Sequence, residues 1–285
     1  MAPGEPTVTR VAGMDDAELL ATFDRQIRRV PDPTPDFRVL QRTEPAPLMG
    51  YVPTSPDASW GGGIFWCDLD ESTADAAIAA AVDEFRPHGN EWEWKHYGYD
   101  RPADLTDRLR AAGFEPDDEE ALVVGETAVV IERLADAPQP EGITFRLLRS
   151  DPEGAAEDWQ GVNDLNLAVW DEDSSDMTAS IARTMAADPD GTSMWVAVAD
   201  DGTVVCAARI NFHRGTDFAS LWGGSTLAEY RGRGIYKGLV ARRADEAAER
   251  GFQVLQVDAS PDSRPILERL GLRTLTSTTP WMWRP

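Results

Sequence analysis

Residues 227–239 read LAEYRGRGIYKGL, and this stretch decides the fold. An apolar segment, residues 219–226, precedes it, and a good helix former, residues 236–250, follows it. A strand, a turn with glycines and arginines, and a helix together make an anion site. The turn aims backbone N–H groups at one point, and the helix adds unpaired donors and its positive dipole end. The stretch therefore predicts a site for a ligand that carries phosphate groups.

The spacing of the glycines narrows the choice of phosphate ligand. A Walker loop needs four residues between its first glycine and Gly-Lys-Ser/Thr, and this stretch lacks that spacing. A dinucleotide loop needs a third glycine where Lys237 stands, although Asp258 lies at about the right distance for its acidic residue. The glycines thus disfavour a nucleotide-dependent enzyme, while the spacing of Asp258 leaves it open. A tight turn with solvated arginines is a further alternative.

What remains is the pattern Arg-x-x-Gly-x-x, in which Arg231 and Gly234 hold the fixed positions. It resembles the Gln/Arg-x-x-Gly-x-Gly/Ala loop with which GCN5-related N-acetyltransferases, the GNAT family, hold the pyrophosphate of acyl-CoA. Tyr236 departs from the small residue usual in the last position. The resemblance implies acetyl-CoA (coenzyme A) as co-substrate, without a metal. It implies that the cofactor-binding residues are Thr226, Leu227, Arg231, Gly232, Arg233, Gly234, Ile235, Tyr236 and Ser263.

The segments around the loop also follow the order of this family. Downstream we expect a strand over 253–258, a short helix over 263–270 and a strand pair within 273–283. Upstream we expect a strand over 143–149, helices over 158–170 and 175–187, and a hairpin of strands 195–199 and 204–212 around Asp200-Asp201-Gly202. The resemblance therefore implies a GNAT N-acetyltransferase domain over residues 143–285. Its fold class is α/β (α+β), with a central mixed, mostly antiparallel twisted sheet flanked by helices.

The chain before a Pro-bearing linker at 135–142 has a strand–helix order of its own. We expect strands over 63–69, 91–99, 121–124 and 128–134, and helices over 72–86 and 102–112. The helix ends at 105–114 and 267–272 both finish in Gly plus an apolar residue after an Asp–Arg–Pro cluster. We interpret 1–138 as a degenerate GNAT-like copy, a tandem arrangement like that of mycothiol synthase-like proteins. Chance is the alternative, because glycine commonly ends helices.

The N-terminal copy lacks the loop. After residues 63–67 come carboxylates at 68, 70, 71 and 75, with no glycine or arginine among residues 68–75. Carboxylates at a helix start suit its dipole but repel a pyrophosphate. We therefore expect a single cofactor site, in the C-terminal half.

Composition limits the partners. A net charge of −23 argues against nucleic acid, whose binding depends on lysine and arginine. The basic residues of 229–243 are a local exception that suits an anion. No stretch reaches the length of a membrane span, no signal region opens the chain, and the two cysteines lie far apart. We expect a cytoplasmic, bacterial protein, monomer or homodimer, without membrane or nucleic-acid partners.

The family's chemistry is direct attack of a neutral primary amine on the thioester, which needs a base for the amine and an acid for the thiolate. The usual acid is a tyrosine on the last helix, but Leu267 stands there. The candidate catalytic residues are Asp258, Ser260, Asp171 and Glu172, with His213 and the Tyr236 hydroxyl as weaker candidates. We predict an acyl-CoA-dependent N-acetyltransferase acting on a small-molecule or peptidic amine. The alternative is a non-catalytic acyl-CoA-binding module of the same fold.

Overall fold

The computed structural model describes residues 13–31, 35–54, 60–148 and 156–285. The chain divides into two compact units. Unit 1 consists of Met1–Leu20, Val123–Val257 and Pro265–Arg273, and unit 2 of Ala21–Leu122, Asp258–Arg264 and Thr274–Pro285. The linker expected at residues 135–142 lies inside unit 1, so the compact units do not divide there. Each unit is built from separate pieces of the chain.

The sheet of unit 1 has the strand order β6-β11-β10-β9-β8-β7. Neighbouring strands from β7 to β10 are antiparallel, whereas β10 and β11 are parallel. The strands are β6 (Glu120–Glu126), β7 (Ile143–Leu147), β8 (Thr192–Ala199), β9 (Val204–Phe212), β10 (Phe218–Thr226) and β11 (Val254–Ala259). A mixed, mostly antiparallel sheet flanked by helices is what the sequence predicted.

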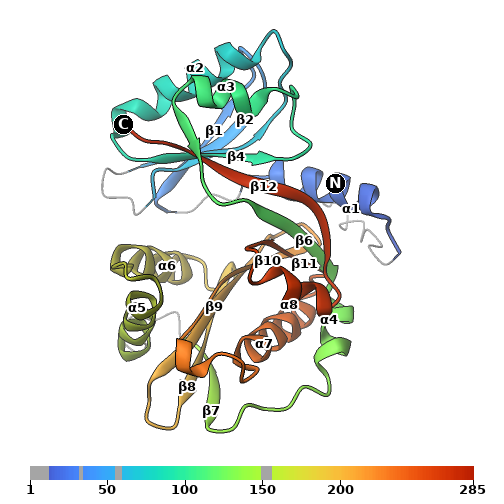
Figure 1. Ribbon diagram of the computed structural model, residues 1–285, viewed down its shortest axis with the longest axis vertical. Coiled ribbons are helices and arrows are strands. Elements are labelled where there is room, and N and C mark those ends of the chain that lie inside the picture. The colour runs from blue at the N-terminus through green and yellow to red at the C-terminus, as the bar shows by residue number, and fades with distance from the viewer. Residues whose placement is uncertain (1–12, 32–34, 55–59, 149–155) are drawn as a thin grey trace, which may run out of the picture. The chain divides into compact units, whose positions relative to one another are not determined.

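Helices cover both faces of this sheet, as Figure 1 shows. Alternate residues of β8 point to opposite faces: Val196 packs with α5 and α6, and Ala197 packs with α7. We call these the α5/α6 face and the α7 face. The helices of unit 1 are α4 (Thr127–Leu134), α5 (Ala156–Trp170), α6 (Ser175–Ala187) and α7 (Ile235–Glu249), with most of α1 (Asp16–Phe23) and of α8 (Arg264–Arg269).

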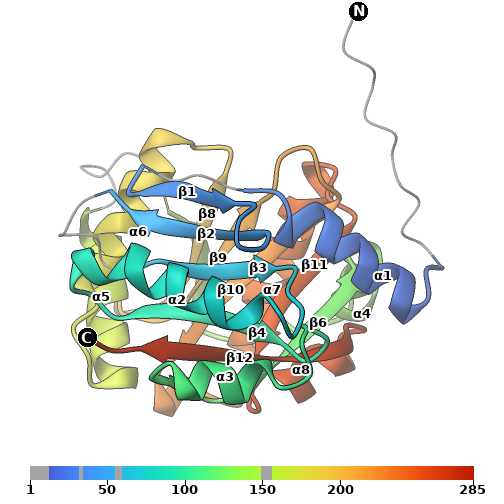
Figure 2. The same cartoon turned by 90° about the horizontal axis from the view of Figure 1, so that it is seen from above.

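Unit 2 has the strand order β1-β2-β3-β4-β12, which can be followed in Figure 2, and β5 also pairs with β12. Its core is aromatic: the ring of Trp92 stacks on Phe85 and meets Phe114 edge-on. Its elements are η1 (Asp24–Arg28), β1 (Phe37–Arg42), β2 (Leu48–Pro53), β3 (Gly63–Cys67), α2 (Ala74–Phe85), η2 (Arg86–His88), β4 (Trp92–Tyr97), α3 (Leu105–Ala111), β5 (Phe114–Pro116) and β12 (Arg273–Trp283).

Each unit contains one parallel strand pair connected by a helix. In unit 1 the pair is β10 and β11, with α7 between them in sequence; in unit 2 it is β3 and β4, with α2 between them. Antiparallel strands precede both pairs. This shared order is what a duplicated fold predicts, and the degenerate copy stays a prediction.

Two expected elements were wrong. Residues 273–283 form one strand rather than a pair, because they contain no turn-forming glycine or asparagine and Pro280 fits within the ladder opposite Lys95. Residues 128–134, expected as a strand from Val129, Val130 and Ile131, belong to α4. β-branched residues favour strands only weakly, so the packing of α4 against α7 decides the conformation.

Candidate functional site

The basic loop follows β10 through a short turn, η3 (Ala228–Tyr230), and leads directly into α7. Gly232 has φ +75° and Gly234 has φ +82°, a left-handed conformation that other residues rarely adopt. A Cβ atom built on either glycine meets no atom within 4 Å. The backbone of the loop is therefore bare on the side where a ligand would approach.

The N–H groups of this loop lack partners. Within the described residues, no backbone hydrogen bond is donated by residues 232–237, and the first bond of α7 runs from Gly238 N to Gly234 O at 3.0 Å. No acidic residue occupies the first turn of α7. A run of open donors at a helix N-terminus favours an anion, because the partial positive charges converge there. The loop thus has the backbone geometry that a diphosphate requires.

The arginines of the loop brace its backbone. Arg231 donates from Nε to the Thr226 carbonyl at 3.1 Å, and Arg233 donates from Nη2 to the Glu141 carbonyl at 2.9 Å. Both side chains are exposed, so their remaining N–H groups are accessible to a ligand. The positions of both residues fit the expected cofactor site, and their contact with a ligand stays a prediction.

β10 is irregular just before the loop. Its register against β9 shifts between Gly223 and Ser225, a β-bulge at a pair of glycines. β10 and β11 pair only from Phe218 to Ser220, so the two strands pair at one end alone. The Leu227 N–H donates to the Val205 carbonyl at 3.0 Å, so it is not available to a ligand. An extended ligand beside β10 would have to form hydrogen bonds with other backbone groups.

Tyr236 lies on the α7 face of β10. A Cβ on Gly224 would lie 2.6 Å from Cε2 of Tyr236, so only glycine leaves room for this ring. The guanidinium of Arg243, which is 1% exposed, donates to the carbonyls of Leu239 and Arg209 and stands beside the Tyr236 hydroxyl. Burial raises the pKa of Tyr236, and burial lowers the pKa of Arg243. The large residue in the last loop position is therefore packed inward, and Ile235 is the first fully buried apolar residue of α7.

Asp258, a candidate base, belongs to an ionic cluster within unit 2. The ammonium of Lys95 lies 3.2 Å from Oδ2 of Asp258, 2.9 Å from Glu120 and 4.0 Å from Glu93. Oδ1 of Asp258 is buried without a hydrogen-bond partner in the described part of the chain. Burial raises the pKa of Glu93 despite the lysine. A base role for Asp258 would require it to act while paired with Lys95.

The other candidate catalytic residues lie on the surface. Ser260 and Ser263 contact each other, with 3.2 Å between their hydroxyl oxygens, and both are exposed or nearly so. Asp171 and Glu172 are exposed in the turn between α5 and α6, where Asp171 has φ +56°. These contacts are those of turns, and nothing in them tests a catalytic role.

Two further residues named from the sequence are constrained by their packing. Leu267 is fully buried, so the position of the family's usual acid points into the core. The Nε2 atom of His213 lies at hydrogen-bond distance from the Ser220 hydroxyl, which also accepts from Gln256. That arrangement gives His213 a structural partner on β10.

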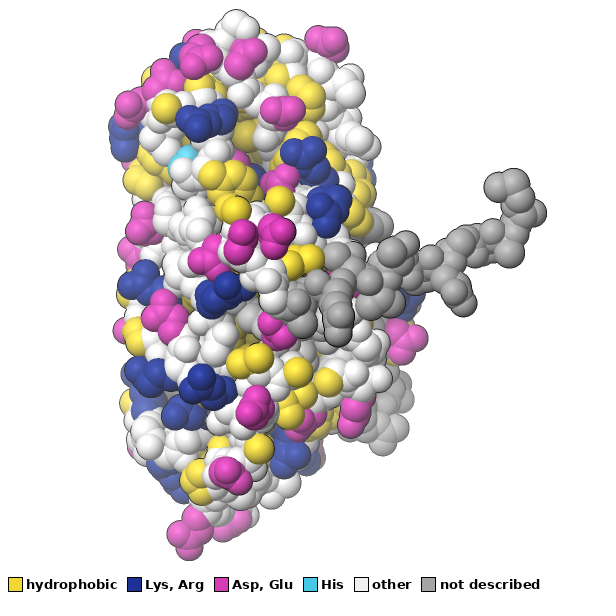
Figure 3. Space-filling view, turned by 90° about the vertical axis from the view of Figure 1, so that its right-hand side faces the viewer, with side chains coloured by type: hydrophobic (Ala, Val, Ile, Leu, Met, Phe, Trp, Pro, Cys, Tyr) yellow, Lys and Arg dark blue, Asp and Glu magenta, His cyan; other side chains and the backbone are white. Residues whose placement is uncertain are grey.

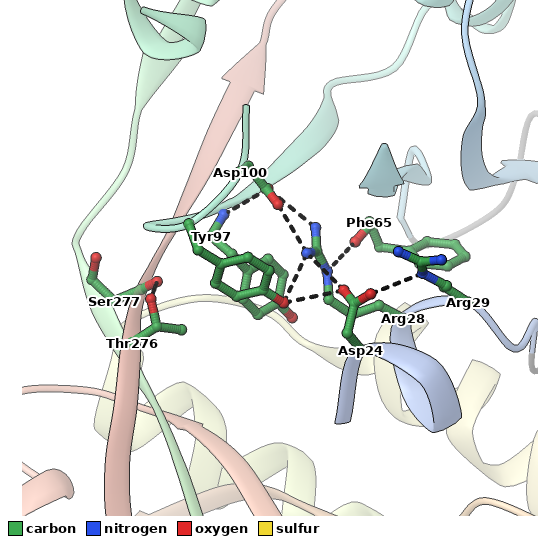
Figure 4. A network of polar contacts seen from close by, with 9 residues as sticks. Asp24, Arg28, Arg29, Phe65, Tyr97, Asp100, Thr276 and Ser277 are labelled. Atoms are coloured by element: carbon green, nitrogen blue, oxygen red, sulfur yellow. Dashed lines mark hydrogen bonds and ion pairs between the residues drawn. The ribbon is translucent and has the colours of Figure 1, made fainter. Parts of the chain in front are cut away.

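A second polar network lies in unit 2, around the buried Arg28 (Figure 4). Its guanidinium donates to both oxygens of Asp100 at 2.9 and 3.1 Å, to the Tyr99 hydroxyl at 2.9 Å and to the Phe65 carbonyl at 3.0 Å. It also stacks on the ring of Tyr97, 4.0 Å from the centroid. The cation is thus paired with a carboxylate, a phenol and a carbonyl of the fold itself, and losing one partner would leave a buried charge uncompensated.

Sequence reasoning missed Arg209 of β9. The Nε atom of its side chain is buried, and within the described part of the chain that side chain has no hydrogen bond or ion pair. Its backbone carbonyl accepts from Arg243. The signal was present in the sequence, as an arginine inside the apolar strand VVCAARINF.

On the face that Figure 3 displays, Lys and Arg side chains lie among Asp and Glu, without a broad patch of one sign. Unpaired arginine is therefore a local exception in an acidic protein.

Comparisons with known proteins agree with this geometry. Residues 157–272 match the model of a family described as the acetyltransferase (GNAT) family. A search of curated proteins found no match. A GCN5-related N-acetyltransferase from Kribbella flavida is 16% identical with a TM-score of 0.62, over 95% of this chain and 94% of that one.

Two more solved structures are similar. A tandem GNAT protein from the clavulanic acid biosynthesis pathway is 15% identical, with a TM-score of 0.61 over 88% of this chain and 84% of that one. A GCN5-related N-acetyltransferase from Sphaerobacter thermophilus is 15% identical, with a TM-score of 0.55 over 94% and 86%. At these identities the likeness concerns the fold alone.

Within the described residues there is neither a candidate metal site nor a candidate membrane-spanning helix. No group of three or more His, Cys, Asp or Glu side chains is arranged to hold a metal ion. None of the helices there has both the length and the apolar composition that a membrane crossing needs.

Proposed function

We propose that this chain, which belongs to the acetyltransferase (GNAT) family through residues 157–272, transfers an acetyl group from acetyl-CoA to a primary amine of a small molecule or peptide. Members of this family transfer acyl groups from acetyl-CoA. The observation that carries the proposal for this chain is the run of open N–H groups at residues 232–237, at the start of α7. When bound, acetyl-CoA supplies the activated acyl group.

The fit of this ligand rests on the loop itself. The left-handed Gly232 and Gly234 keep side chains away from the donors, and the arginines on either side of Gly232 add positive charge near them. A diphosphate matches a row of backbone donors better than a carboxylate does, because it offers more acceptor oxygens. We infer that the loop binds the diphosphate, and that the parting of β10 and β11 after Ser220 leaves room for the thioester.

The amine must lose its proton before it attacks, and the departing thiolate must gain one. Asp171 and Glu172 are exposed carboxylates that a water molecule would connect to an ammonium group. Tyr236 keeps its phenolic proton at neutral pH, because burial raises its pKa, and it lies against the bulge of β10. We therefore propose Tyr236 as the proton donor that replaces the tyrosine missing at Leu267, with solvent as the other source.

A second function is favoured by one observation. Leu267 is fully buried, and no other hydroxyl takes its place on α8. The chain would then bind acyl-CoA without transferring the acyl group. The acetyltransferase and the non-catalytic binding module would both bind CoA at the same loop, so CoA binding alone does not distinguish these two functions.

Thiol release separates them. Purified protein is first titrated with CoA by calorimetry, and then incubated with acetyl-CoA and a panel of primary amines while free thiol is measured. The proposed function predicts CoA binding and amine-dependent thiol release. Binding without release for every amine would favour the non-catalytic module. No CoA binding, combined with protection by NAD or ATP, would favour a nucleotide-dependent protein.

A further inference from the structure

An unpaired arginine lies on the α5/α6 face of the sheet in unit 1. Arg209 of β9 stands opposite Met194 of β8 and Trp222 of β10 in the strand register, so the three side chains share one face. Met194 packs in the cluster of α5 and α6, which identifies that face. The guanidinium carbon of Arg209 lies 5.1 Å from the centre of the Trp222 ring. Within the described residues, this cation–π contact is the one polar or aromatic contact of the Arg209 side chain.

Two other buried arginines have polar partners, although Nη2 of Arg243 is also buried without one within the described residues. Arg28 has a carboxylate, a phenol and a carbonyl, and Arg243 has backbone carbonyls. Arg209 has none of these among the described residues, although the chain carries 50 acidic side chains against 27 basic ones. Burial without a counter-charge lowers the pKa of Arg209 to about 10, which still leaves it charged at neutral pH. A half-buried cation without an anion is costly, and a ligand that supplies the anion removes the cost.

Two exposed indoles lie on the same face of the sheet as this cation. Trp222 is 41% exposed, and Trp170, at the end of α5, is 64% exposed. The Trp170 Nε1 atom donates to the hydroxyl of Ser225 at 2.9 Å, which fixes its ring across β10 on the same face. Exposed tryptophans held in place are typical of ligand-binding walls, because an indole offers a large rigid surface at small entropic cost. Arg209 thus lies on the sheet in contact with the Trp222 ring, and Trp170 is held on the same face by Ser225.

The neighbourhood of β10 connects this part of the sheet to the proposed transfer site. Trp222 immediately precedes the Gly223-Gly224 bulge, and Ser225 immediately follows it. The proposed diphosphate loop follows β10 through η3, and both the loop and β10 belong to unit 1. An acceptor held on the α5/α6 face would reach the bulge from the side opposite to α7.

We propose that Arg209 binds a carboxylate group of the amine acceptor, so that the substrate class is an amino acid or another amine that also bears a carboxylate. This inference rests on the proposed acetyltransferase function. The planar guanidinium matches a carboxylate with two parallel hydrogen bonds, and Trp222 and Trp170 pack against the apolar part of the acceptor. The cation serves binding and orientation, while the amine itself remains free to attack.

The test compares acceptors in matched pairs. The pairs are ω-amino carboxylates from glycine to 6-aminohexanoate, together with phenylalanine, each set against its own carboxamide. Thiol release from acetyl-CoA gives kcat and KM for wild type, Arg209→Gln and Arg209→Lys. Arg214→Gln is the control, because Arg214 is an exposed arginine of the β9–β10 connection with carboxylate partners of its own.

We expect wild type to favour one or more carboxylates over their amides by about tenfold or more in kcat/KM, the range of a charge-assisted hydrogen bond. Arg209→Gln should abolish this preference through KM and leave the amides unchanged, and Arg209→Lys should restore part of it. Arg214→Gln should behave as wild type. Equal turnover of acids and amides by wild type, or an equal loss for both in Arg209→Gln, would overturn the carboxylate site while acetyl transfer stands.

The experiment also distinguishes failure of the proposed acetyltransferase function from failure of the carboxylate site. If no amine of either kind releases thiol, the proposed function fails, and calorimetric titration of wild type and Arg209→Gln with the same amino carboxylates decides the site directly. Heat of binding that is lost in Arg209→Gln but retained in Arg214→Gln would support a carboxylate site. Absence of binding to wild type would overturn it.

Discussion

Replacing Gly234 tests the loop most sharply, because this residue combines an unusual backbone with an open position. Its φ of +82° places it in the left-handed region, and nothing lies within 4 Å of a Cβ built there. An alanine in this conformation costs about 1–2 kcal/mol. For a protein of this size, that cost corresponds to a fall in Tm of about 2–8 °C. Gly234→Ala should therefore fold, with a modest loss of stability.

The glutamate variant adds charge where the diphosphate should bind. Two unit charges 4 Å apart repel by about 1 kcal/mol in water and about 4 kcal/mol at an effective dielectric constant near 20. Gly234→Glu should accordingly weaken CoA binding by about fivefold to a thousandfold beyond the loss in Gly234→Ala. Titration calorimetry with CoA measures this loss, and a thermal melt reports stability in the same samples.

Gly202 provides the matched control. It lies in the turn between β8 and β9 with φ +89°, and again no atom lies within 4 Å of a built Cβ. Gly202→Ala and Gly202→Glu should lose as much stability as the Gly234 variants and retain full CoA affinity. If Gly234→Glu bound CoA as tightly as Gly202→Glu, the loop would not be the diphosphate site.

Three further predictions concern single charges. Arg231→Ala should weaken CoA binding by about tenfold, because it removes a charge-assisted contact with the ligand and a hydrogen bond that braces the loop. Unchanged affinity would show that the Arg231 side chain does not contact the ligand. Glu93→Gln should raise Tm at pH 7 but not at pH 4. Burial raises the pKa of Glu93 in the folded state, so wild type loses stability as pH rises above the ordinary value of 4.5, and glutamine abolishes that loss; an equal effect at both pH values would contradict this. Asp100→Asn should cost about 3–5 kcal/mol in urea unfolding, because Arg28 would remain buried without its carboxylate, and a cost below about 1 kcal/mol would refute the pairing argument.

Apart from α4, the sequence predicted the main elements of unit 1, because their signals are local. Asp200-Asp201-Gly202 is a hairpin turn between alternating strands, and the bounds expected for the helix at 175–187 coincide with those of α6. The bulge at Gly223-Gly224 also follows from residue type, since paired glycines permit positive φ within a strand. Such features depend on neighbours in the chain and are accessible without a structure.

The misses depend on contacts between distant segments. Nothing in residues 273–283 indicates that they pair with β4, which lies about 180 residues earlier, so the division of the chain into units could not be foreseen. The partner of Asp258 is Lys95, again remote in sequence, and its pairing changes what the carboxylate can do. The sequence alone does not distinguish Arg209 from the other arginines. The strand register does, because it places Arg209 opposite Trp222.

The two units show why one chain would hold one cofactor site. Both contain a helix between parallel strands, and the N-terminus of that helix is where an anion would bind. In unit 2 the carboxylate of Asp70 already accepts from the backbone N–H groups of Ser72 and Thr73 at 2.8 and 3.0 Å. The hydrogen bond from the Ser72 hydroxyl and those from the two N–H groups lower the pKa of Asp70, so an ionised side chain already occupies the turn that leads into α2. In unit 1 glycines stand at 232 and 234, and the donors remain open. If the loop of unit 1 binds the diphosphate as proposed, the difference between the two units is whether the chain supplies its own anion.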